Sequence, residues 1–503
     1  MAVKKNVVAN FAGSAWSALI GLAFVPIYIH YLGVEAYGVI GVFVSLQAVL
    51  GILDMGLATT LNRELARLSA TEGTSEQVHD TLRTLEWLYW ASAVAVGILL
   101  VSISPLIANH WVRPDKLSRP EIQQAFLFLC LVTALRWPCG LYAGGLNGLQ
   151  RQISLNVLTA IAMTVQGVGS VLVLWLVSPT LNTFLTWQVV AALLHVATLA
   201  LYTRSVLPRI ERKAKFDRKI LIQIWRFAAG MSGLTILVLL LTQLDKIILS
   251  TLLDLTMFGY YTFAVAVAVS LNRLITPLFA AIFPRLTQLV AENRLDELTR
   301  FYHQASQLSS ALIVPASLML ILFSKEIIFA WTGSQNLVDE TYLVISLLSI
   351  GTLLNSLLSV PYSLQLAYGW TGLAVRMNLF AVIMIVPLVI VLTNHFGIVG
   401  PPIAWILLNS GYLIFDIKFM HKRLLSREKW EWYVKDVGIP LVVGLAIAMG
   451  FRLFFEYETS RLFLWMILFG IGMIVSIGTF LACPRLRPFI AIPEVLKSKR
   501  NLK

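Results

Sequence analysis

The stretch QISLNVLTAIAMTVQGVGSVLVLWLVSPTLNTFLTWQVVAALLHVATLALYT, residues 152–203, decides the fold because it contains no Asp, Glu, Lys or Arg. A helix needs about 20 apolar residues to cross the hydrocarbon core of a bilayer, and this run is broken only at Ser178-Pro179. The stretch therefore predicts two membrane-spanning helices joined by a short turn. Barrel strands are excluded because the apolar segments are too long and too uniform, so the backbone groups must be satisfied within helices.

The rest of the chain has the same character. Of its 503 residues, 58% are hydrophobic and 13% are charged, whereas soluble globular proteins carry about 25% charged residues. This composition excludes a water-soluble fold, a disordered chain and a fibre, and it predicts an all-α polytopic membrane protein. We expect about fourteen transmembrane helices, with the predicted ranges 8–32, 36–60, 85–108, 121–147, 153–177, 181–203, 221–251, 256–284, 301–323, 339–367, 371–393, 398–419, 434–455 and 460–482.

The basic residues predict how these helices are oriented. Most of the 39 Lys and Arg residues fall on one side of the membrane if the N-terminus is placed in the cytoplasm. Cytoplasmic loops carry an excess of Lys and Arg, so both termini are expected to be cytoplasmic. The net charge of +13 is interpreted as a topology signal, and a nucleic-acid partner is not expected.

A basic cytoplasmic linker, predicted over residues 206–220, divides the helices into groups. An N-terminal six-helix lobe is predicted over 1–205 and a C-terminal six-helix lobe over 221–424. Two additional transmembrane helices follow over 434–483, and a basic cytoplasmic tail covers 484–503. Because six is an even number, the two lobes would share one orientation in the membrane, with a cavity between them near the midplane.

Enzyme chemistry is not expected. The cysteines, Cys130, Cys139 and Cys483, show neither a CxxC pattern nor a metal-ligand spacing, so no metal site, disulfide framework or cofactor is predicted. The sequence contains no G-x-x-x-x-G-K-[ST] phosphate loop, so direct ATP hydrolysis is not expected. The predicted loops are too short for the aqueous domain of a membrane glycosyltransferase. A transporter is the class that remains.

Short motifs at the start of each predicted lobe give the chain a family resemblance. They are Asn10-Phe11-Ala12-Gly13, Leu32-Gly33 with Tyr37-Gly38, Asp54-Met55-Gly56 with Arg63, and Gln243-Leu244-Asp245-Lys246 with Gly259-Tyr260. With these motifs the chain resembles the polysaccharide flippases of the multidrug/oligosaccharidyl-lipid/polysaccharide exporter superfamily, of the O-antigen (Wzx-like) type.

The resemblance implies a fold and a function. Such proteins look like two six-helix lobes in a V that alternates its opening, and fourteen helices match the longer members. They move undecaprenyl-diphosphate-linked oligosaccharide, an O-antigen or another surface polysaccharide repeat unit, from the cytoplasmic to the outer leaflet of the cell inner membrane. The implied partners are this lipid-linked saccharide, membrane lipid and a polysaccharide polymerase, and the implied energy source is a proton or sodium gradient.

Basic residues inside the predicted helices are the candidate substrate contacts. A charge in the hydrocarbon region costs at least about 2.5–3.5 kcal/mol. Arg136 and Arg273 lie near the middle of their helices, Lys246 lies on a polar helical face and Arg376 lies near a cytoplasmic end. A diphosphate offers strong acceptor oxygens to such cations. We predict substrate binding by Arg136, Lys246, Arg273, Arg376 and, from the shared motif, Arg63.

Other interpretations of these cations stay open. Arg136 and Arg273 can instead satisfy a carbonyl freed by a following proline, or pair with an acid in a neighbouring helix. Arg376 can reach the cytoplasmic interface by extending along its aliphatic stem. Asp245 is next to Lys246 but about 100° away around the helix, so we do not expect these two to pair.

Two intramembrane acids, Asp54 and Asp245, are the predicted ion-coupling residues. They either pair with the cations or carry the coupling proton or sodium ion, because a buried carboxylate can exchange a proton near neutral pH unless a cation holds it ionised. The alternative function is a cation-coupled multidrug exporter of the same superfamily. Its cavity would be acidic, with a carboxylate in the first helix, and residues 6–34 contain no Asp, Glu, Lys or Arg.

Overall fold

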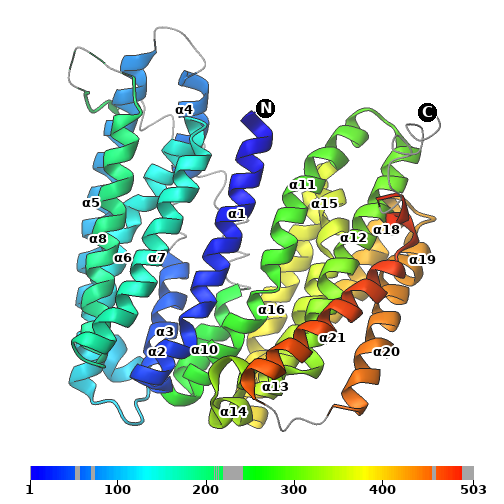
Figure 1. Ribbon diagram of the computed structural model, residues 1–503. Coiled ribbons are helices and arrows are strands. Elements are labelled where there is room, and N and C mark those ends of the chain that lie inside the picture. Colours follow the sequence, from blue (N-terminus) through cyan, green and yellow to red (C-terminus); the bar gives the residue numbers. More distant parts are fainter. Residues whose placement is uncertain are drawn as a thin grey trace, which may run out of the picture. The chain divides into compact units, whose positions relative to one another are not determined.

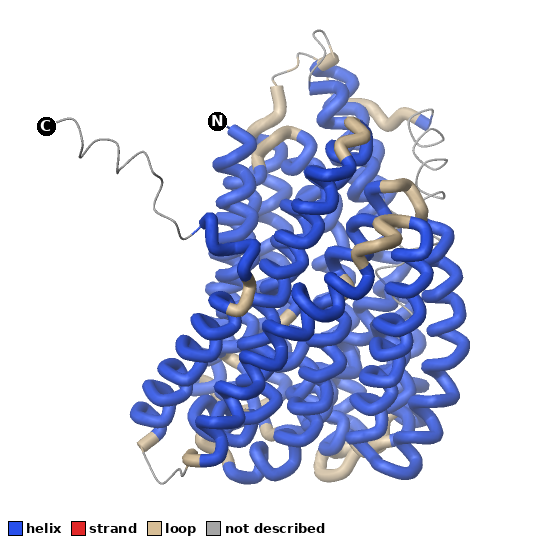
Figure 2. Tube along the Cα trace, turned by 90° about the vertical axis from the view of Figure 1, so that its right-hand side faces the viewer, coloured by secondary structure: helices blue, strands red, loops and turns tan. Residues whose placement is uncertain are grey.

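The protein is described here by a computed structural model, which covers residues 2–50, 57–69, 74–208, 210, 212, 214–218, 242–455 and 460–489. Within these ranges the regular structure is helical (Figures 1 and 2), and an isolated β-bridge joins Arg113 to Asp254. The expected all-α fold is therefore confirmed for the described part of the chain. The chain forms two compact units, residues 1–262 and 263–503.

The first unit contains the helices of the N-terminal half. They are α1 (Ala2–Ala23), α2 (Val25–Leu32), α3 (Val34–Leu50), α4 (Leu57–Ser69), α5 (Ser75–Leu106), η2 (Ile107–Trp111), α6 (Arg119–Gly148), α7 (Gln152–Leu176) and α8 (Leu181–Ser205). Residues 242–252 are also helical, and α10 (Leu255–Val269) contains the boundary between the units. Helices α4, α5, α6 and α8 share one core, in which Leu61, Leu65, Leu85, Leu141 and Tyr142 are fully buried.

The second unit contains the helices from α11 onward. They are α11 (Asn272–Ala291), α12 (Leu295–Leu322), α13 (Ser324–Thr332), α14 (Gln335–Leu357), α15 (Ser359–Ala367), α16 (Thr371–Phe396), η3 (Gly397–Val399), α17 (Gly400–Gly411), η4 (Tyr412–Asp416), α18 (Ile417–Arg423), α19 (Lys429–Glu431), η5 (Trp432–Gly438), α20 (Ile439–Leu453), α21 (Arg461–Leu481) and η6 (Pro484–Phe489). Its core buries Tyr302, Phe323 and Trp432 completely.

The turns predicted inside the long apolar stretches are present. Helix α7 ends at Leu176 and α8 begins at Leu181, so the break falls at Ser178-Pro179 as expected. The hydroxyl of Thr180 caps α8 by accepting a hydrogen bond from the backbone N–H of Thr183. Gly397 ends α16 with a φ of 56°, which L side chains rarely adopt and glycine tolerates.

Eleven runs of helix among the described residues are long and apolar enough to cross a membrane. They are Ala12–Leu32, Ser75–Trp111, Arg119–Gly148, Gln152–Leu176, Leu181–Ser205, Leu255–Ala291, Leu295–Leu322, Gln335–Ala367, Thr371–Arg423, Lys429–Leu453 and Arg461–Leu481. The expectation of fourteen differs from this number for three reasons. The predicted ranges 36–60 and 221–251 include residues outside the described part. The predicted ranges 371–393 and 398–419 form one run, Thr371–Arg423, with a 3-10 turn between its helices. The fourteen-helix arrangement stays a prediction.

Two glycines from the family motifs lie against one another in the first unit. A Cβ atom added to Gly38 in α3 would lie 2.2 Å from the carbonyl oxygen of Leu255, and one added to Gly259 in α10 would lie 2.2 Å from the carbonyl oxygen of Val34. Neither position has room for a side chain. Small residues of this kind let the backbones of two membrane helices approach closely.

The two C-terminal helices, α20 and α21, pack against α12 within the second unit. A guanidinium–carboxylate pair joins Arg452 in α20 to Glu326 in α13, and the Glu326 side chain is almost fully buried. Arg461 at the start of α21 donates hydrogen bonds to the carbonyl oxygen of Ala330 at 3.0 and 3.1 Å. The last helices are therefore fastened to the second unit by charged groups as well as by apolar contacts. The predicted lobe boundaries themselves stay predictions.

Candidate functional site

Arg136 lies in α6 of the first unit, and it is partly buried. Its Nε atom is buried and has no hydrogen-bond partner, and among the described residues no carboxylate forms an ion pair with it. The side chain thus keeps hydrogen-bonding capacity that the fold does not use. The expected alternative, in which Arg136 is paired with an acid of a neighbouring helix, does not occur among the described residues.

His195 in α8 is the polar neighbour of Arg136. It lies within electrostatic range of the guanidinium, and its Nε2 atom is also buried without a hydrogen-bond partner. Two unsatisfied nitrogens from adjacent helices therefore lie in the interior of the same unit. Buried polar atoms are usually hydrogen-bonded, so these two nitrogens are exceptions within the described part of the first unit. The sequence alone does not single out His195, because one histidine in an apolar helix is more often a packed polar residue than a proton relay.

Lys246 and Asp245 lie together in the helical segment 242–252. Lys246 Nζ donates a hydrogen bond to the carbonyl oxygen of Thr242 at 2.6 Å and lies 3.8 Å from Asp245 Oδ1. The expectation that these two neighbours do not pair is wrong at this distance, because the lysine stem curls back toward the preceding turn. Asp245 also accepts a hydrogen bond of 2.7 Å from the hydroxyl of Tyr261 in α10. Its Oδ1 atom has no hydrogen-bond partner.

Arg273 lies at a break within one predicted transmembrane run. Ser270 and Leu271 form a turn between α10 and α11, and the backbone N–H of Arg273 bonds to the carbonyl oxygen of Ser270 at 3.1 Å. The Arg273 side chain is exposed, and it forms no ion pair with any described residue. Discontinuous membrane helices place polar groups at transport sites in many carriers, so this position suits a substrate contact.

The remaining predicted residues are less constrained. Arg376 is exposed in the first turns of α16 and forms no ion pair within the described ranges, and Arg63 is exposed on α4. Asp54 lies outside the described residues. The structure therefore brings together Lys246 and Asp245 from the predicted set. The single cavity that was predicted to receive Arg136, Lys246 and Arg273 stays a prediction, because these residues belong to different units.

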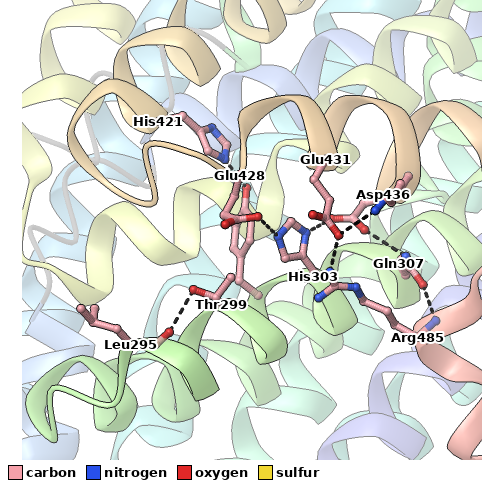
Figure 3. A network of polar contacts seen from close by, with 11 residues as sticks. Leu295, Thr299, His303, Gln307, His421, Glu428, Glu431, Asp436 and Arg485 are labelled. Carbon is pink, nitrogen blue, oxygen red and sulfur yellow. Dashed lines mark hydrogen bonds and ion pairs between the residues drawn. The ribbon is translucent and has the colours of Figure 1, made fainter.

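A buried polar network in the second unit was not predicted (Figure 3). His303 in α12 is fully buried, and its Nδ1 atom bonds to the carboxylate of Asp436 in η5, which is also fully buried. Its Nε2 atom lies 3.2 Å from Glu428 Oε2. Gln307, one turn further along α12, donates a hydrogen bond of 3.0 Å to the second oxygen of Asp436.

The network continues into η6, at the end of the described chain. The backbone N–H of Arg485 donates to Gln307 Oε1 at 2.9 Å, and its guanidinium pairs with Glu431. Ligand atoms of His303, Glu428 and Glu431 lie within 4.8 Å of one another, as in a metal site. The carboxylate of Glu431, however, already forms an ion pair with Arg485. The His303 (i) and Gln307 (i+4) spacing on α12 was the signal available in the sequence. The arrangement links α12, η5 and η6 through hydrogen bonds and ion pairs.

Comparisons with known proteins agree with this helical architecture. The chain matches the family described as polysaccharide biosynthesis protein over residues 3–290. It is 22% identical over 430 residues to a protein of Shigella flexneri named "Putative O-antigen transporter", with 85% of this chain and 99% of the relative covered.

Solved structures share the fold at low identity. The chain is similar to the lipid II flippase MurJ in an inward closed conformation, with a TM-score of 0.71, 14% identity and coverage of 96% of this chain and 99% of that one. It is also similar to a multidrug resistance MATE family transporter of the MOP superfamily in an inward-facing conformation, with a TM-score of 0.63, 14% identity and coverage of 84% and 96%.

Proposed function

Because the chain belongs to the polysaccharide biosynthesis protein family, we propose that it is a membrane flippase for undecaprenyl-diphosphate-linked oligosaccharide. The cargo would be an O-antigen or another surface polysaccharide repeat unit, carried from the cytoplasmic to the outer leaflet of the inner membrane. The name of the Shigella flexneri relative and the fold shared with a lipid II flippase support this proposal. The chain would act as a transporter and not as an enzyme, with both termini in the cytoplasm.

The observation that carries the proposal is the unpartnered Nε atom of Arg136 inside a membrane helix. A cation without an acid partner is costly in a low-dielectric interior, and an anionic head group offsets that cost when it arrives. Diphosphate oxygens accept bidentate hydrogen bonds from a guanidinium. Further positive charge along the path of the head group would come from Lys246, Arg273, Arg376 and Arg63.

Alternating access would move the cargo, with the lipid tail remaining in the bilayer. The break between α10 and α11 at Arg273 interrupts a membrane helix, and discontinuous helices of this kind form the binding sites of many carriers. Asp245 and Asp54 would couple the cycle to a proton or sodium gradient. Asp245 would exchange the ion in competition with Lys246 Nζ, which lies 3.8 Å from its Oδ1 atom, while its other oxygen bonds to Tyr261. A polysaccharide polymerase would receive the product.

A flipping assay in proteoliposomes tests the proposal. The variants Arg136→Ala, Lys246→Ala and Arg273→Ala are compared with Arg67→Ala, which removes an exposed arginine that pairs with Glu64. Each is given an anionic diphosphate-linked sugar and a neutral lipid-linked sugar. Charged hydrogen bonds contribute about 1.5–3 kcal/mol each, so we expect the anionic cargo to move about tenfold more slowly in Arg136→Ala, with Arg67→Ala unaffected. Normal flipping by all three variants contradicts the electrostatic mechanism, and uptake of organic cations instead of lipid favours a multidrug exporter.

A further inference from the structure

A row of adjoining hollows follows the face of α5 in the first unit. At one end lies a small hollow of about 200 Å³, which is lined by Arg83, Glu86, Trp87, Trp90 and Arg204. Trp90 also begins a second hollow of about 400 Å³ between α5 and α6. Trp87 is shared with a third hollow, whose far wall is Phe216 of the segment that follows α8. The three hollows adjoin through the shared side chains of Trp87 and Trp90, with a charged hollow beside two apolar ones.

The charged end is organised around a buried glutamate. The Glu86 side chain is 5% exposed, whereas those of Arg83 and Arg204 are 46% and 52% exposed. Arg204 donates to Glu86 Oε1 from two nitrogens, at 2.9 and 3.2 Å, and Arg83 approaches Oε2 at 3.5 Å. The hydroxyl of Tyr142 donates to Glu86 at 3.1 Å and accepts from Trp90 Nε1 at 3.4 Å.

Two guanidinium groups are therefore held beside one carboxylate, and these three groups together carry a net charge of about +1. Both arginines keep donors that face outward, because Glu86 uses only part of the five donors on each. The next acids along α5, Glu76 and Asp80, pair with Arg212 and do not neutralise this excess. The charge and the geometry fit a single phosphodiester, which carries one negative charge.

The apolar end has the length of one membrane leaflet. Its lining runs along α5 from Trp90 through Ala93, Gly97 and Val101 to Ser102, with Leu131 and Ala134 on the facing side of α6. Twelve residues of helix rise about 18 Å, and half of the hydrocarbon core is about 15 Å. Gly97 lets α5 and α6 approach closely beside the groove, because a Cβ at this position would lie 3.2 Å from Ala134 Cβ.

We propose that this feature is a binding site for one anionic phospholipid, with its phosphodiester on Arg83 and Arg204 and an acyl chain in the groove between α5 and α6. The tryptophans at the junction, Trp87 and Trp90, suit the interfacial depth at which such rings are enriched. The site belongs to the first unit alone and is separate from Arg136, Lys246 and Arg273. The ligand is a resident lipid of the bilayer and not the transported cargo.

Native mass spectrometry of the purified full chain in detergent tests this site. The probe is palmitoyl-oleoyl phosphatidylglycerol, and the two other arms are glycerol phosphate and undecaprenyl diphosphate. Arg83→Gln removes the less tightly held arginine and leaves the Arg204–Glu86 pair intact, and its matched control is Arg67→Gln, because Arg67 also pairs with a glutamate three residues away. Leu131→Trp fills the groove, and Leu99→Trp on α5 is its control, because both leucines are 49% exposed and Leu99 is outside the groove.

We expect one tightly bound phosphatidylglycerol, with affinity about tenfold lower in Arg83→Gln, as for the loss of a charged hydrogen bond. Leu131→Trp should weaken binding at least as much, while Arg67→Gln and Leu99→Trp bind as the parent does. The proposal is overturned if Arg67→Gln weakens binding equally, if Leu131→Trp has no effect, if glycerol phosphate binds as tightly as the lipid, or if undecaprenyl diphosphate displaces the phospholipid at equal concentration.

Discussion

Replacing Arg136 by Met separates a substrate contact from a structural arginine. Met has nearly the volume of the arginine stem and no charge, so it fills the same space in α6 without seeking a partner. If Arg136 has no acid partner, as the described residues indicate, removing its charge relieves a desolvation cost. The protein should then become more stable while transport of an anionic cargo falls. A structural arginine would lose both properties together.

The size of the effect follows from the burial of the side chain. A charge at the centre of a membrane helix costs about 2.5–3.5 kcal/mol on insertion scales. Only the Nε atom of Arg136 is fully buried without a partner, and the side chain as a whole is partly accessible, so the gain should be about 1 kcal/mol. The contrast is Arg452→Met, which leaves the buried Glu326 carboxylate without its partner. Breaking a buried pair in this way costs about 3–5 kcal/mol.

Thermal unfolding in one detergent measures the stability of each variant, and flipping in proteoliposomes measures its transport of the anionic cargo. Arg136→Met should unfold a few degrees higher than the parent and flip anionic lipid-linked sugar about tenfold more slowly. Arg452→Met should unfold well below the parent. The reasoning fails if Arg136→Met is destabilised as much as Arg452→Met, because Arg136 would then be a structural residue. It also fails if Arg136→Met is stable and transports normally.

Three further predictions concern the fold around the site. Gly38→Ala should destabilise the first unit by about 1–3 kcal/mol, the usual cost of overpacking, because the new Cβ would lie 2.2 Å from a carbonyl oxygen. The control is Gly21→Ala, where no atom lies within 4 Å of the new Cβ. This variant should be neutral or slightly stabilising in thermal unfolding. Asp436→Ala should lower stability by about 3 kcal/mol and should expose the C-terminal segment to limited proteolysis, and unchanged cleavage would show that apolar contacts alone hold it. Arg212→Ala should speed backbone hydrogen exchange in the described residues between 206 and 218, because the pairs of Arg212 with Asp80 and Glu76 hold that segment on α5. The melting temperature should not change. Exchange as slow as in the parent protein would contradict this prediction.

The apolar helices could be predicted from the sequence because their signal is local. Residues 152–203 contain enough apolar residues for two crossings, and Ser178-Pro179 marks the turn that the structure has between Leu176 and Leu181. Arg273 could be placed near the middle of its run, but the break at Ser270 could not, since Pro277 lies inside α11 and does not end it. Helix continuity depends on packing and on hydrogen bonds that a composition window does not contain.

The polar networks could not be predicted because their partners are far apart in the sequence. His303 and Asp436 meet across 133 residues, and Arg204 meets Glu86 across 118. Arg83 and Arg204 count among the basic residues interpreted as topology signals, and that interpretation stays a prediction, since a basic residue can orient a helix whatever it contacts. The count of Lys and Arg in a loop says nothing about which of them a buried carboxylate holds.

The arginines of the described chain differ in whether another group of the protein binds them, and this difference bears on function. Arg452, Arg461 and Arg485 use their donors on Glu326, Ala330 and Glu431, and in doing so they fasten the C-terminal helices to the second unit. The desolvation penalty of these cations is offset in part, because each has a partner close by. Arg136 and Arg273 are the opposite case, because no described carboxylate pairs with them although both lie within membrane-spanning runs. Arg136, whose Nε atom is buried without a hydrogen-bond partner, and the exposed Arg273 are therefore the candidates for contact with a negatively charged ligand.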